Sequence, residues 1–502
     1  MKLLMIGCDG VKAETFNRGW TPFIQSLIDK GHSLHLKEDL ISRGWSEIVT
    51  GRHAVDTGAL YEGPHADGSL RWGEKFRLSD VPGLGTSVKP IWQTLNENGY
   101  RVGIMNVPTT YPAPEVNGFF VSGGGGGGPI TQRAAPEQCH PQSLAPWLNG
   151  MDYIVDERMP TLLAEKGLYA PDDFFSRLDL MTQKRTKAFI DLANKHSIDF
   201  GFIVYRSTVT AETLLPPELD KLETGYRNVN HDFISAAKTF YQRLDEKIRI
   251  LTEAFPRAEV LLVSDHSMDT RRYAVNSNGF LVESGYQVPS KSKQSLFGIV
   301  KSFKHLVPHT IRARLKKNRK IQVAYESMTT FDSTATKAFS MAFSNGAHGI
   351  YINDTHRFGG PVPSADIEPL VSEIIDKFNS HPLAQQHGFN AYPRPQSCSP
   401  VADKFPDIVI DLPDGYQTSN RFSAFVVETP LPTKPFNLRD MHKDPRTTGK
   451  AHTPLAVNTK NAWKCGPQPY PDNLTAVYRH ILEQLPAQHA RDHMTPSDVE
   501  AS

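Results

Sequence analysis

The chain has 502 residues, 39% of them hydrophobic and 22% charged, which is typical of a globular protein with a sizeable core. Its formal net charge of +1 gives no electrostatic reason to expect a nucleic-acid partner. No stretch approaches the roughly 18 apolar residues of a membrane span, and the opening MKLLMIGCDG has too short an apolar run, and no cleavage site, for a signal peptide.

Strand-like and helix-like segments alternate along the chain. Short apolar runs bounded by Gly, Pro or polar residues predict buried parallel strands, and apolar residues at i, i+3, i+4 spacing predict helices between them. The predicted strands are 2–7, 100–107, 200–205 and 258–265, and the predicted helices are 21–31, 89–99 and 233–255. This order predicts an α/β fold with a mostly parallel sheet flanked by helices on both faces.

Residues 287–321 interrupt this pattern with a basic, partly amphipathic segment. A solvated helical insertion or lid is one interpretation, and a surface that contacts a membrane or another anionic partner is the other. The four cysteines (Cys8, Cys139, Cys398 and Cys465) lie far apart without zinc-site spacing. They are interpreted as free thiols, so we expect a cytoplasmic protein.

Polar residues follow two of the predicted strands directly. The first strand ends in Asp9, and the strand VLLVS is followed by Asp265 and His266. Ligands of parallel sheets bind outside the carboxyl ends of the strands. Two carboxylates and an imidazole at this edge can hold a divalent metal, zinc or alternatively manganese.

Six segments occur in a familiar order: IGCDG, WSEIVTGR, GIMNVPTTYPAPEVNGFFVSG, VLLVSDHS, FPDIVIDLPDGY and GKAHTPLAV. Together they resemble the type I phosphodiesterase/nucleotide pyrophosphatase branch of the alkaline phosphatase superfamily, over roughly residues 1–460. The resemblance implies an alkaline phosphatase-like core at 1–270 and 330–485. It also implies a basic lid or insertion at 271–329, and we expect a flexible tail at 486–502.

The resemblance also implies a mechanism. In the family two divalent metals, usually zinc, flank the phosphoryl group. A Thr or Ser at a helix N-terminus attacks it, and water cleaves the covalent intermediate. Matching the motifs assigns Asp9 to one metal, Asp265 and His266 to both, and His452 to the other.

Several positions depart from the family pattern. Ile41 stands where the nucleophile is expected, ten residues before Gly51, and Thr57 stands where the family usually has His. After the strand at 200–205, Thr208 and Glu212 replace an Asp and a His. Glu212 can still ligate a metal, so the resemblance implies one or two ions per chain.

The nucleophile is therefore left open between two interpretations of Ser42. A loop one residue shorter than usual would bring Ser42 to the attacking position; otherwise Ser42 is the N-cap of the following helix. The neighbouring Arg43 can clamp an anionic group or stand in for the charge of a lost metal.

These features predict a metal-dependent hydrolase or transferase that cleaves a phosphodiester or related small anionic ester. The alternative is a catalytically degenerate relative that binds an anionic ligand or a protein partner. Ile41, Thr57 and Thr208 favour that alternative, whereas the surviving ligand-type residues favour an enzyme. The identity of the substrate and the oligomeric state are left open.

Overall fold

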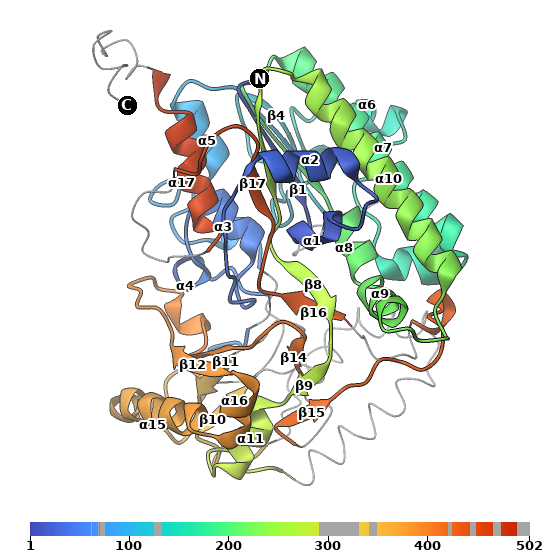
Figure 1. The fold of residues 1–502 in the computed structure, drawn as a ribbon. Helices are drawn as coiled ribbons and strands as arrows, with labels where there is room; N and C mark the ends of the chain where they lie inside the picture. The colour runs from blue at the N-terminus through green and yellow to red at the C-terminus, as the bar shows by residue number, and fades with distance from the viewer. Residues whose placement is uncertain are drawn as a thin grey trace.

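The computed structural model describes residues 1–61, 63–68, 70, 76–124, 133–290, 331–340, 349–419, 424–441, 448–464 and 473–488. A central sheet of eight strands has the order β2-β17-β7-β1-β6-β3-β4-β5 (Figure 1). Five neighbouring strands, from β7 to β4, run parallel. The strands are β1 (Leu3–Cys8), β2 (His32–Ser33), β3 (Val102–Met105), β4 (Gly118–Val121), β5 (Cys139–His140), β6 (Phe200–Tyr205), β7 (Glu259–Val263) and β17 (Ala456–Asn458).

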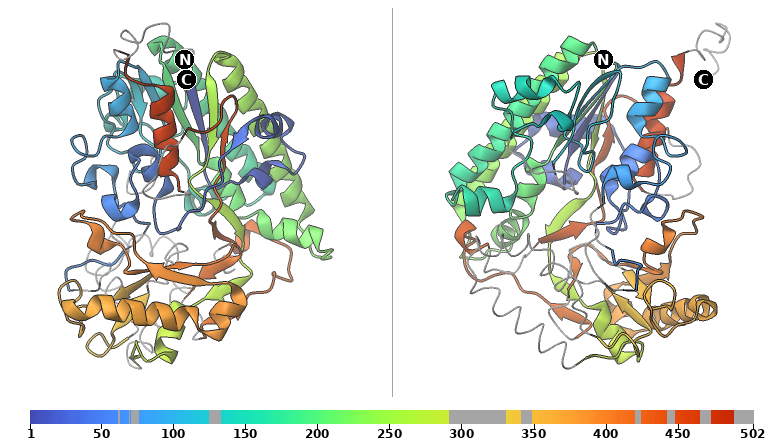
Figure 2. Two further views of the ribbon diagram at one scale, coloured as in Figure 1. Left: turned by 60° about the vertical axis from the view of Figure 1, so that its left-hand side comes forward. Right: turned by 180° about the vertical axis from the view of Figure 1, so that it is seen from behind.

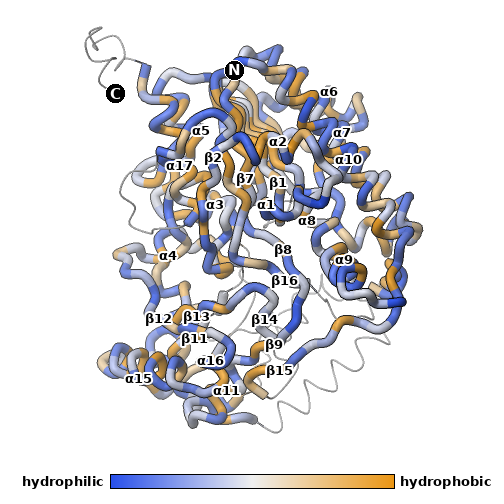
Figure 3. Tube along the Cα trace, in the orientation of Figure 1, coloured by the Kyte–Doolittle hydropathy of each residue, from blue (hydrophilic) through white to orange (hydrophobic). Residues whose placement is uncertain are grey.

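Alternating side chains of β1 enter two different cores, because successive residues of a strand point to opposite faces. Leu4 and Ile6 pack in the core shared with one helical layer, and Leu3 and Met5 pack in the core shared with the other. The first layer contains α2 (Pro22–Lys30), α7 (Pro171–His196) and α10 (His231–Ala254), and the second contains α3 (Gly44–Thr50), α5 (Ile91–Glu97) and α17 (Thr475–Gln484). Figure 3 shows the apolar residues concentrated along the central strands.

The predicted α/β fold is confirmed. The strand expected at 200–205 coincides with β6, and the helix expected at 233–255 lies within a residue or two of α10. The long helix α7, which packs against α10, was not predicted.

A smaller body lies beyond the carboxyl ends of the parallel strands (Figures 1 and 2). Its elements share a separate apolar core, which includes Phe280, Ile352 and Ile410. One sheet has the order β10-β11-β13-β12 and another has the order β14-β9-β15. The elements are β9 (Tyr273–Val275), α11 (Ser277–Glu283), β10 (Ala338–Ser340), β11 (Gly349–Ile352), α15 (Ile367–Asn379), α16 (Pro382–His387), β12 (Asn390–Pro393), β13 (Ile408–Asp411), β14 (Tyr416–Thr418) and β15 (Val426–Glu428).

A two-stranded antiparallel ribbon, β8 (Ser267–Thr270) with β16 (Thr448–Ala451), runs between the two bodies (Figure 1). The remaining short α-helices are α1 (Ala13–Phe16), α4 (Ala54–Thr57), α6 (Leu144–Gly150), α8 (Ser207–Glu212) and α9 (Pro216–Glu223). No helix in the described ranges is both long and apolar enough to cross a membrane.

The division into a core, an insertion at 271–329 and a tail at 486–502 stays a prediction. Most of the basic segment 287–321 and most of the tail lie outside the described residues. Three of the cysteines, Cys8, Cys139 and Cys398, are free thiols in the structure.

Candidate active site and metal centre

Asp9, Asp265 and His266 come together at the carboxyl edge of the main sheet. Asp9 follows β1 directly, and Ser264 separates β7 from Asp265. Because β1 and β7 are adjacent and parallel, with Gly7 opposite Val263, both strand ends open at the same edge. One ligand atom from each residue lies within 4.8 Å of the other two, and all three side chains are buried.

The spacing of these atoms fits a divalent metal. Nε2 of His266 lies 3.9 Å from Oδ1 of Asp9 and 3.6 Å from Oδ2 of Asp265, too far for hydrogen bonds. Tetrahedral zinc with bonds of about 2.0–2.1 Å separates its ligands by roughly 3.4 Å. Oδ1 of Asp265 is buried and has no hydrogen-bond partner among the described residues, as expected of an oxygen that binds a cation.

The protonation of the group suits the same ligand. Nδ1 of His266 lies 2.8 Å from the Ser267 carbonyl oxygen and donates to it, which leaves Nε2 to face the carboxylates. Burial and the Lys450 ammonium lower the pKa of His266 to about 3, so the ring is neutral. Burial, helped by Asp265, raises the pKa of Asp9 to about 6. A metal ligand must be a neutral imidazole or an ionised carboxylate, and both forms are present near neutral pH.

Trp45 and Tyr61 orient the two carboxylates. The indole Nε1 of Trp45 donates to Oδ2 of Asp9 at 3.2 Å, and the Tyr61 hydroxyl donates to Oδ2 of Asp265 at 3.2 Å. The Trp45 ring also packs so closely on β1 that a Cβ at Gly7 would lie 2.6 Å from it. Trp45 therefore both packs in the core and orients a candidate metal ligand.

Two cations act on this group: Arg206 contacts Asp9, and Lys450 interacts electrostatically with Asp265 and His266. Nε of Arg206 lies 3.5 Å from Oδ2 of Asp9, and its Nη1 donates to Asp156 at 2.6 Å. Burial lowers the pKa of the Arg206 guanidinium, but the carboxylates of Asp156 and Asp9 outweigh this and hold the pKa above its usual range. The Lys450 ammonium lies 2.9 Å from the Tyr61 ring centroid, and burial lowers its pKa to about 7 against the opposing effect of the carboxylates.

Two more arginines belong to the same electrostatic neighbourhood. The Arg43 guanidinium lies 5.0 Å from the Tyr61 ring centroid and donates to the main-chain carbonyls of Leu60 and Tyr61. Burial lowers the pKa of Arg158, and the nearby charges of Arg206 and Arg43 add to that effect. The edge of the sheet thus collects four cationic side chains around a few carboxylates.

The Ser42 side chain is engaged by Asp39 in this structure. Its hydroxyl donates to Oδ2 of Asp39 at 2.9 Å, and Oδ1 of Asp39 accepts the backbone N–H groups of Ile41 and Ser42. Burial raises the pKa of the Asp39 carboxyl, but hydrogen bonds from His53 and Ser42 outweigh this and hold the pKa below its usual range. Only 2% of Ser42 is exposed.

His53 does not act as a base for Ser42 in this arrangement. Its Nδ1 accepts the N–H of Val55, so in the neutral ring Nε2 carries the proton and donates to Asp39 at 3.0 Å. Oγ of Ser42 lies 3.4 Å from this same nitrogen. The interpretation of Ser42 as a helix N-cap is wrong, because α3 begins at Gly44 and Arg43 is its N-cap residue; the interpretation of Ser42 as the nucleophile stays a prediction.

The positions matched to the second metal lie in other surroundings. The Thr208 hydroxyl donates to main-chain carbonyls, 2.6 Å from the oxygen of Asp9. Both carboxylate oxygens of Glu212 accept from Arg18, at 2.8 and 2.9 Å, and one also accepts from Tyr241. Nδ1 of His452 hydrogen-bonds the Glu38 carbonyl oxygen. Within the described part of the chain, the group of possible metal ligands, Asp9, Asp265 and His266, contains neither Glu212 nor His452.

Arg206, Lys450, Tyr61 and Asp156 were not singled out from the sequence. Arg206 directly follows β6, the strand beside β1, so the strand-end rule that found Asp9 could have found it. Lys450 lies two residues before His452, but nothing in its local sequence distinguishes it from a solvated lysine.

Gly44 allows α3 to pack closely against Asp265, one of the possible metal ligands. A Cβ at this position would lie 2.4 Å from the Asp265 carbonyl oxygen and 2.5 Å from Leu474. We expect Gly44→Ala to lower the free energy of unfolding by about 1–3 kcal/mol, because the main chain of Asp265 or of α3 must shift to make room for the methyl group. Urea denaturation would measure this loss. Gly150→Ala is the matched control, since a Cβ there meets no atom within 4 Å. Equal stability of both variants would contradict this account.

Comparison with known proteins identifies the family. A model described as type I phosphodiesterase/nucleotide pyrophosphatase matches residues 3–423. The chain belongs to this family. A search of curated protein sequences finds no relative of the chain. The resemblance stated from the sequence motifs is thus confirmed, and with it the assignment to the alkaline phosphatase superfamily of hydrolases.

Solved structures of this phosphodiesterase-type fold cover nearly the whole chain. Phosphonoacetate hydrolase from Sinorhizobium meliloti 1021 in complex with phosphonoformate matches with a TM-score of 0.52 and 10% identity, over 97% of this chain and 95% of that chain. The same enzyme with phosphonoacetate gives a TM-score of 0.50 at the same identity and coverage. Murine ectonucleotide pyrophosphatase/phosphodiesterase 5 gives 0.40 at 12% identity, over 97% of this chain and 96% of that chain. At these identities the first two likenesses show the fold alone.

Proposed function

We propose that the protein hydrolyses a small phosphoryl ester at a centre with one divalent metal. The observation that carries the proposal is the buried group of Asp9, Asp265 and His266, whose ligand atoms lie within 4.8 Å of one another and beside Arg206 and Lys450. These three residues would hold the metal, zinc or alternatively manganese. A bound metal would supply positive charge to the phosphoryl group and lower the pKa of the attacking oxygen.

Cationic side chains take the place of a second metal in this proposal. Thr208 and Glu212, at the positions matched to that metal, are engaged with main-chain carbonyls and with Arg18. Arg206 and Lys450 lie beside Asp9 and Asp265 instead. They would bind the non-bridging oxygens of the phosphoryl group and offset its charge as it reacts.

The excess of cations favours a doubly charged phosphoryl group. Arg43, Arg158, Arg206 and Lys450 stand against the carboxylates of Asp9, Asp156 and Asp265, and a metal would add two more positive charges. A phosphate monoester or a phosphonate is a dianion near neutral pH, whereas a phosphodiester carries one charge. We therefore place a monoester or phosphonate before a diester as the substrate class.

Water is the proposed attacking group. Ile41 has no nucleophilic atom, and the Ser42 hydroxyl is directed to Asp39. Ser42 is instead a positioning residue in this proposal, because its contacts fix the loop that precedes Arg43 and α3. Hydrolysis then proceeds without a covalent seryl intermediate.

Metal stoichiometry tests the centre. We expect close to one zinc or manganese ion per chain by plasma mass spectrometry of untagged protein, lost in Asp9→Ala because a ligand is removed. Glu212→Ala is the matched control and should keep its metal, since Glu212 contacts Arg18 rather than the group. A second ion that disappears with Glu212→Ala would replace the one-metal proposal by a two-metal one.

A specific observation also supports the non-catalytic alternative. The nucleophile position is Ile41, buried in the core, and the neighbouring hydroxyl is occupied. If metal-replete protein bound an aryl phosphate without turning it over, the site would be that of an anion-binding protein. Turnover that is lost with the metal in Asp9→Ala would exclude this alternative.

A further inference from the structure

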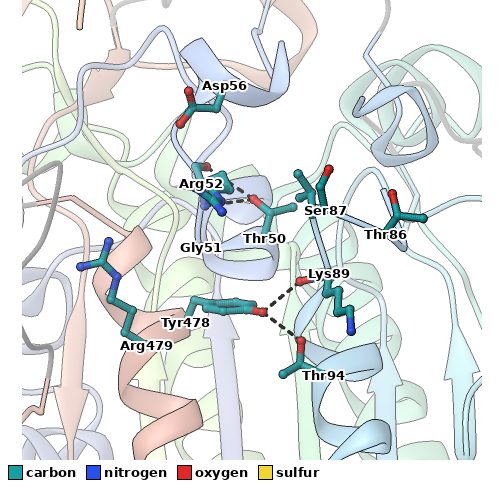
Figure 4. Close-up of a pocket in the computed structure, with 11 residues that line it drawn as sticks. Thr50, Gly51, Arg52, Asp56, Thr86, Ser87, Lys89, Thr94, Tyr478 and Arg479 are labelled. Atoms are coloured by element: carbon teal, nitrogen blue, oxygen red, sulfur yellow. Dashed lines mark hydrogen bonds between the residues drawn. The ribbon is translucent and has the colours of Figure 1, made fainter. Parts of the chain in front are cut away.

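A second polar pocket lies at the far end of α3 from the candidate active site (Figure 4). Its volume is about 580 Å³, and its wall comes from three stretches of chain: 50–56, 86–94 and 478–479. Arg43 caps the beginning of α3, and Arg52 follows its end. The seven residues of this helix span about 10 Å, so the two sites are separate.

Three cations on the pocket wall come from three different segments. Arg52 follows α3, Lys89 precedes α5 and Arg479 belongs to α17 (Figure 4). Within the described part of the chain, Asp56 is the one carboxylate on this wall, and its Oδ1 accepts a hydrogen bond from Ser397 at 2.6 Å. The wall is therefore net positive in a chain whose overall charge is close to zero.

The cations are accessible to a ligand. The Lys89 ammonium contacts Glu97 at 2.6 Å, but the two side chains are 42% and 46% exposed. An exposed pair of this kind contributes little to stability and can exchange its partner. Arg52 is exposed, and Lys89 and Arg479 are half-buried.

Hydrogen bonds and close packing fix Tyr478 in the wall of the pocket. The Tyr478 hydroxyl donates to the Lys89 carbonyl oxygen at 2.9 Å and lies 3.0 Å from Oγ1 of Thr94. A Cβ at Gly51 would lie 2.6 Å from the Tyr478 ring, so α3 and α17 touch here without a gap. Thr86 and Ser87 place further hydroxyls on the opposite side (Figure 4).

We propose that this pocket binds a small phosphorylated molecule, whose phosphate is held by Arg52 and Lys89, while Arg479 adds to the positive charge of the wall. Guanidinium groups present paired N–H donors that match the oxygens of a phosphate, and the Ser87 hydroxyl can add another donor. A volume of about 580 Å³ exceeds that of a lone phosphate and falls in the range of small-molecule sites, roughly 300–1,000 Å³. The remainder of the ligand would occupy the space beside Thr86 and Ser87.

Hydrogen exchange with inorganic phosphate as the probe tests the proposal on the full chain with its metal. We expect phosphate to slow amide exchange in residues 50–56 and 86–94. Arg52→Glu and, separately, Lys89→Glu should raise the phosphate concentration needed for this protection roughly tenfold or more, because each substitution removes a charge-assisted contact. Lys238→Glu, on the exposed face of α10, makes the same charge change elsewhere and should leave the effect intact.

Inhibition of ester hydrolysis by phosphate reports on the candidate active site independently. Protection that is lost in Arg52→Glu and Lys89→Glu, with unchanged inhibition, would support the second site. Absence of protection at saturating phosphate, or protection that survives both substitutions, would overturn it. Only the inhibition measurement needs the proposed hydrolase activity; the protection is measured without a substrate, so its loss or survival in the two variants tests the second site even if that activity is absent.

Discussion

Replacing Arg206 by alanine is expected to lower kcat/KM for an aryl phosphate monoester by roughly 10²–10³-fold without loss of metal. Arg206 is half-buried directly after β6, with Nε 3.5 Å from Asp9 and Nη1 2.6 Å from Asp156. Its charge would stabilise the reacting phosphoryl group, so its removal should affect the reaction. The metal should remain, because removing a cation beside Asp9 reduces the repulsion that a second cation meets.

Arg206→Lys is the conservative companion of this variant. A lysine keeps the charge but not the planar pair of N–H donors, so we expect an activity between the parent and Arg206→Ala. Ser42→Ala is the second companion and should stay within about tenfold of the parent, since the Ser42 hydroxyl is engaged with Asp39. Steady-state kinetics with metal analysis of each variant would measure all three effects.

Two outcomes would contradict this assignment. Full activity of Arg206→Ala would mean that Arg206 does not bind the reacting phosphoryl group. If the variant lost both its metal and its activity, Arg206 would have a structural role instead. A loss in Ser42→Ala as large as that in Asp9→Ala would restore Ser42 as the nucleophile. In that event the hydrogen bond to Asp39 would have to break during the reaction.

The parts of the site that come from strand ends were accessible to sequence reasoning. Asp9, Asp265 and His266 follow buried apolar runs, and adjacency of β1 and β7 brings them together. Arg206 obeys the same rule, although the matching of family motifs drew attention to Thr208 and Glu212 instead. Glu212 is engaged by Arg18, a partner 194 positions away that no local pattern reveals.

The fold was predictable to a similar extent. Apolar runs mark the central strands, because both faces of a parallel sheet are covered. The helix α7 escaped notice because polar residues lie on its buried face: Arg185 is 1% exposed and donates to the carbonyls of Val204 and Val155. The strands of the smaller body have three or four residues each, too few to show a period.

Two buried glutamates behind the site, Glu38 and Glu47, are expected to stabilise the folded protein less and less as the pH rises from about 4.5 to about 8. Burial, with Asp39 nearby, raises the pKa of Glu38 from 4.5 to about 8, and burial with Glu38 nearby raises the pKa of Glu47 as well. Between these pH values the folded state holds a proton that the unfolded chain has lost. The contribution of each such carboxyl to the free energy of unfolding therefore decreases with pH, on the order of 1 kcal/mol per unit.

Glu38→Gln tests this linkage. Glutamine does not ionise and can still accept the Leu474 N–H, which is 3.0 Å from Oε1 of Glu38. Urea denaturation from about pH 4.5 to about pH 8, at constant metal content, should show Glu38→Gln gaining stability over the parent as the pH rises. Glu137→Gln is the control at an exposed position and should follow the parent at every pH. Parallel curves for Glu38→Gln and the parent would mean that the Glu38 carboxyl ionises as readily in the folded chain as in the unfolded one.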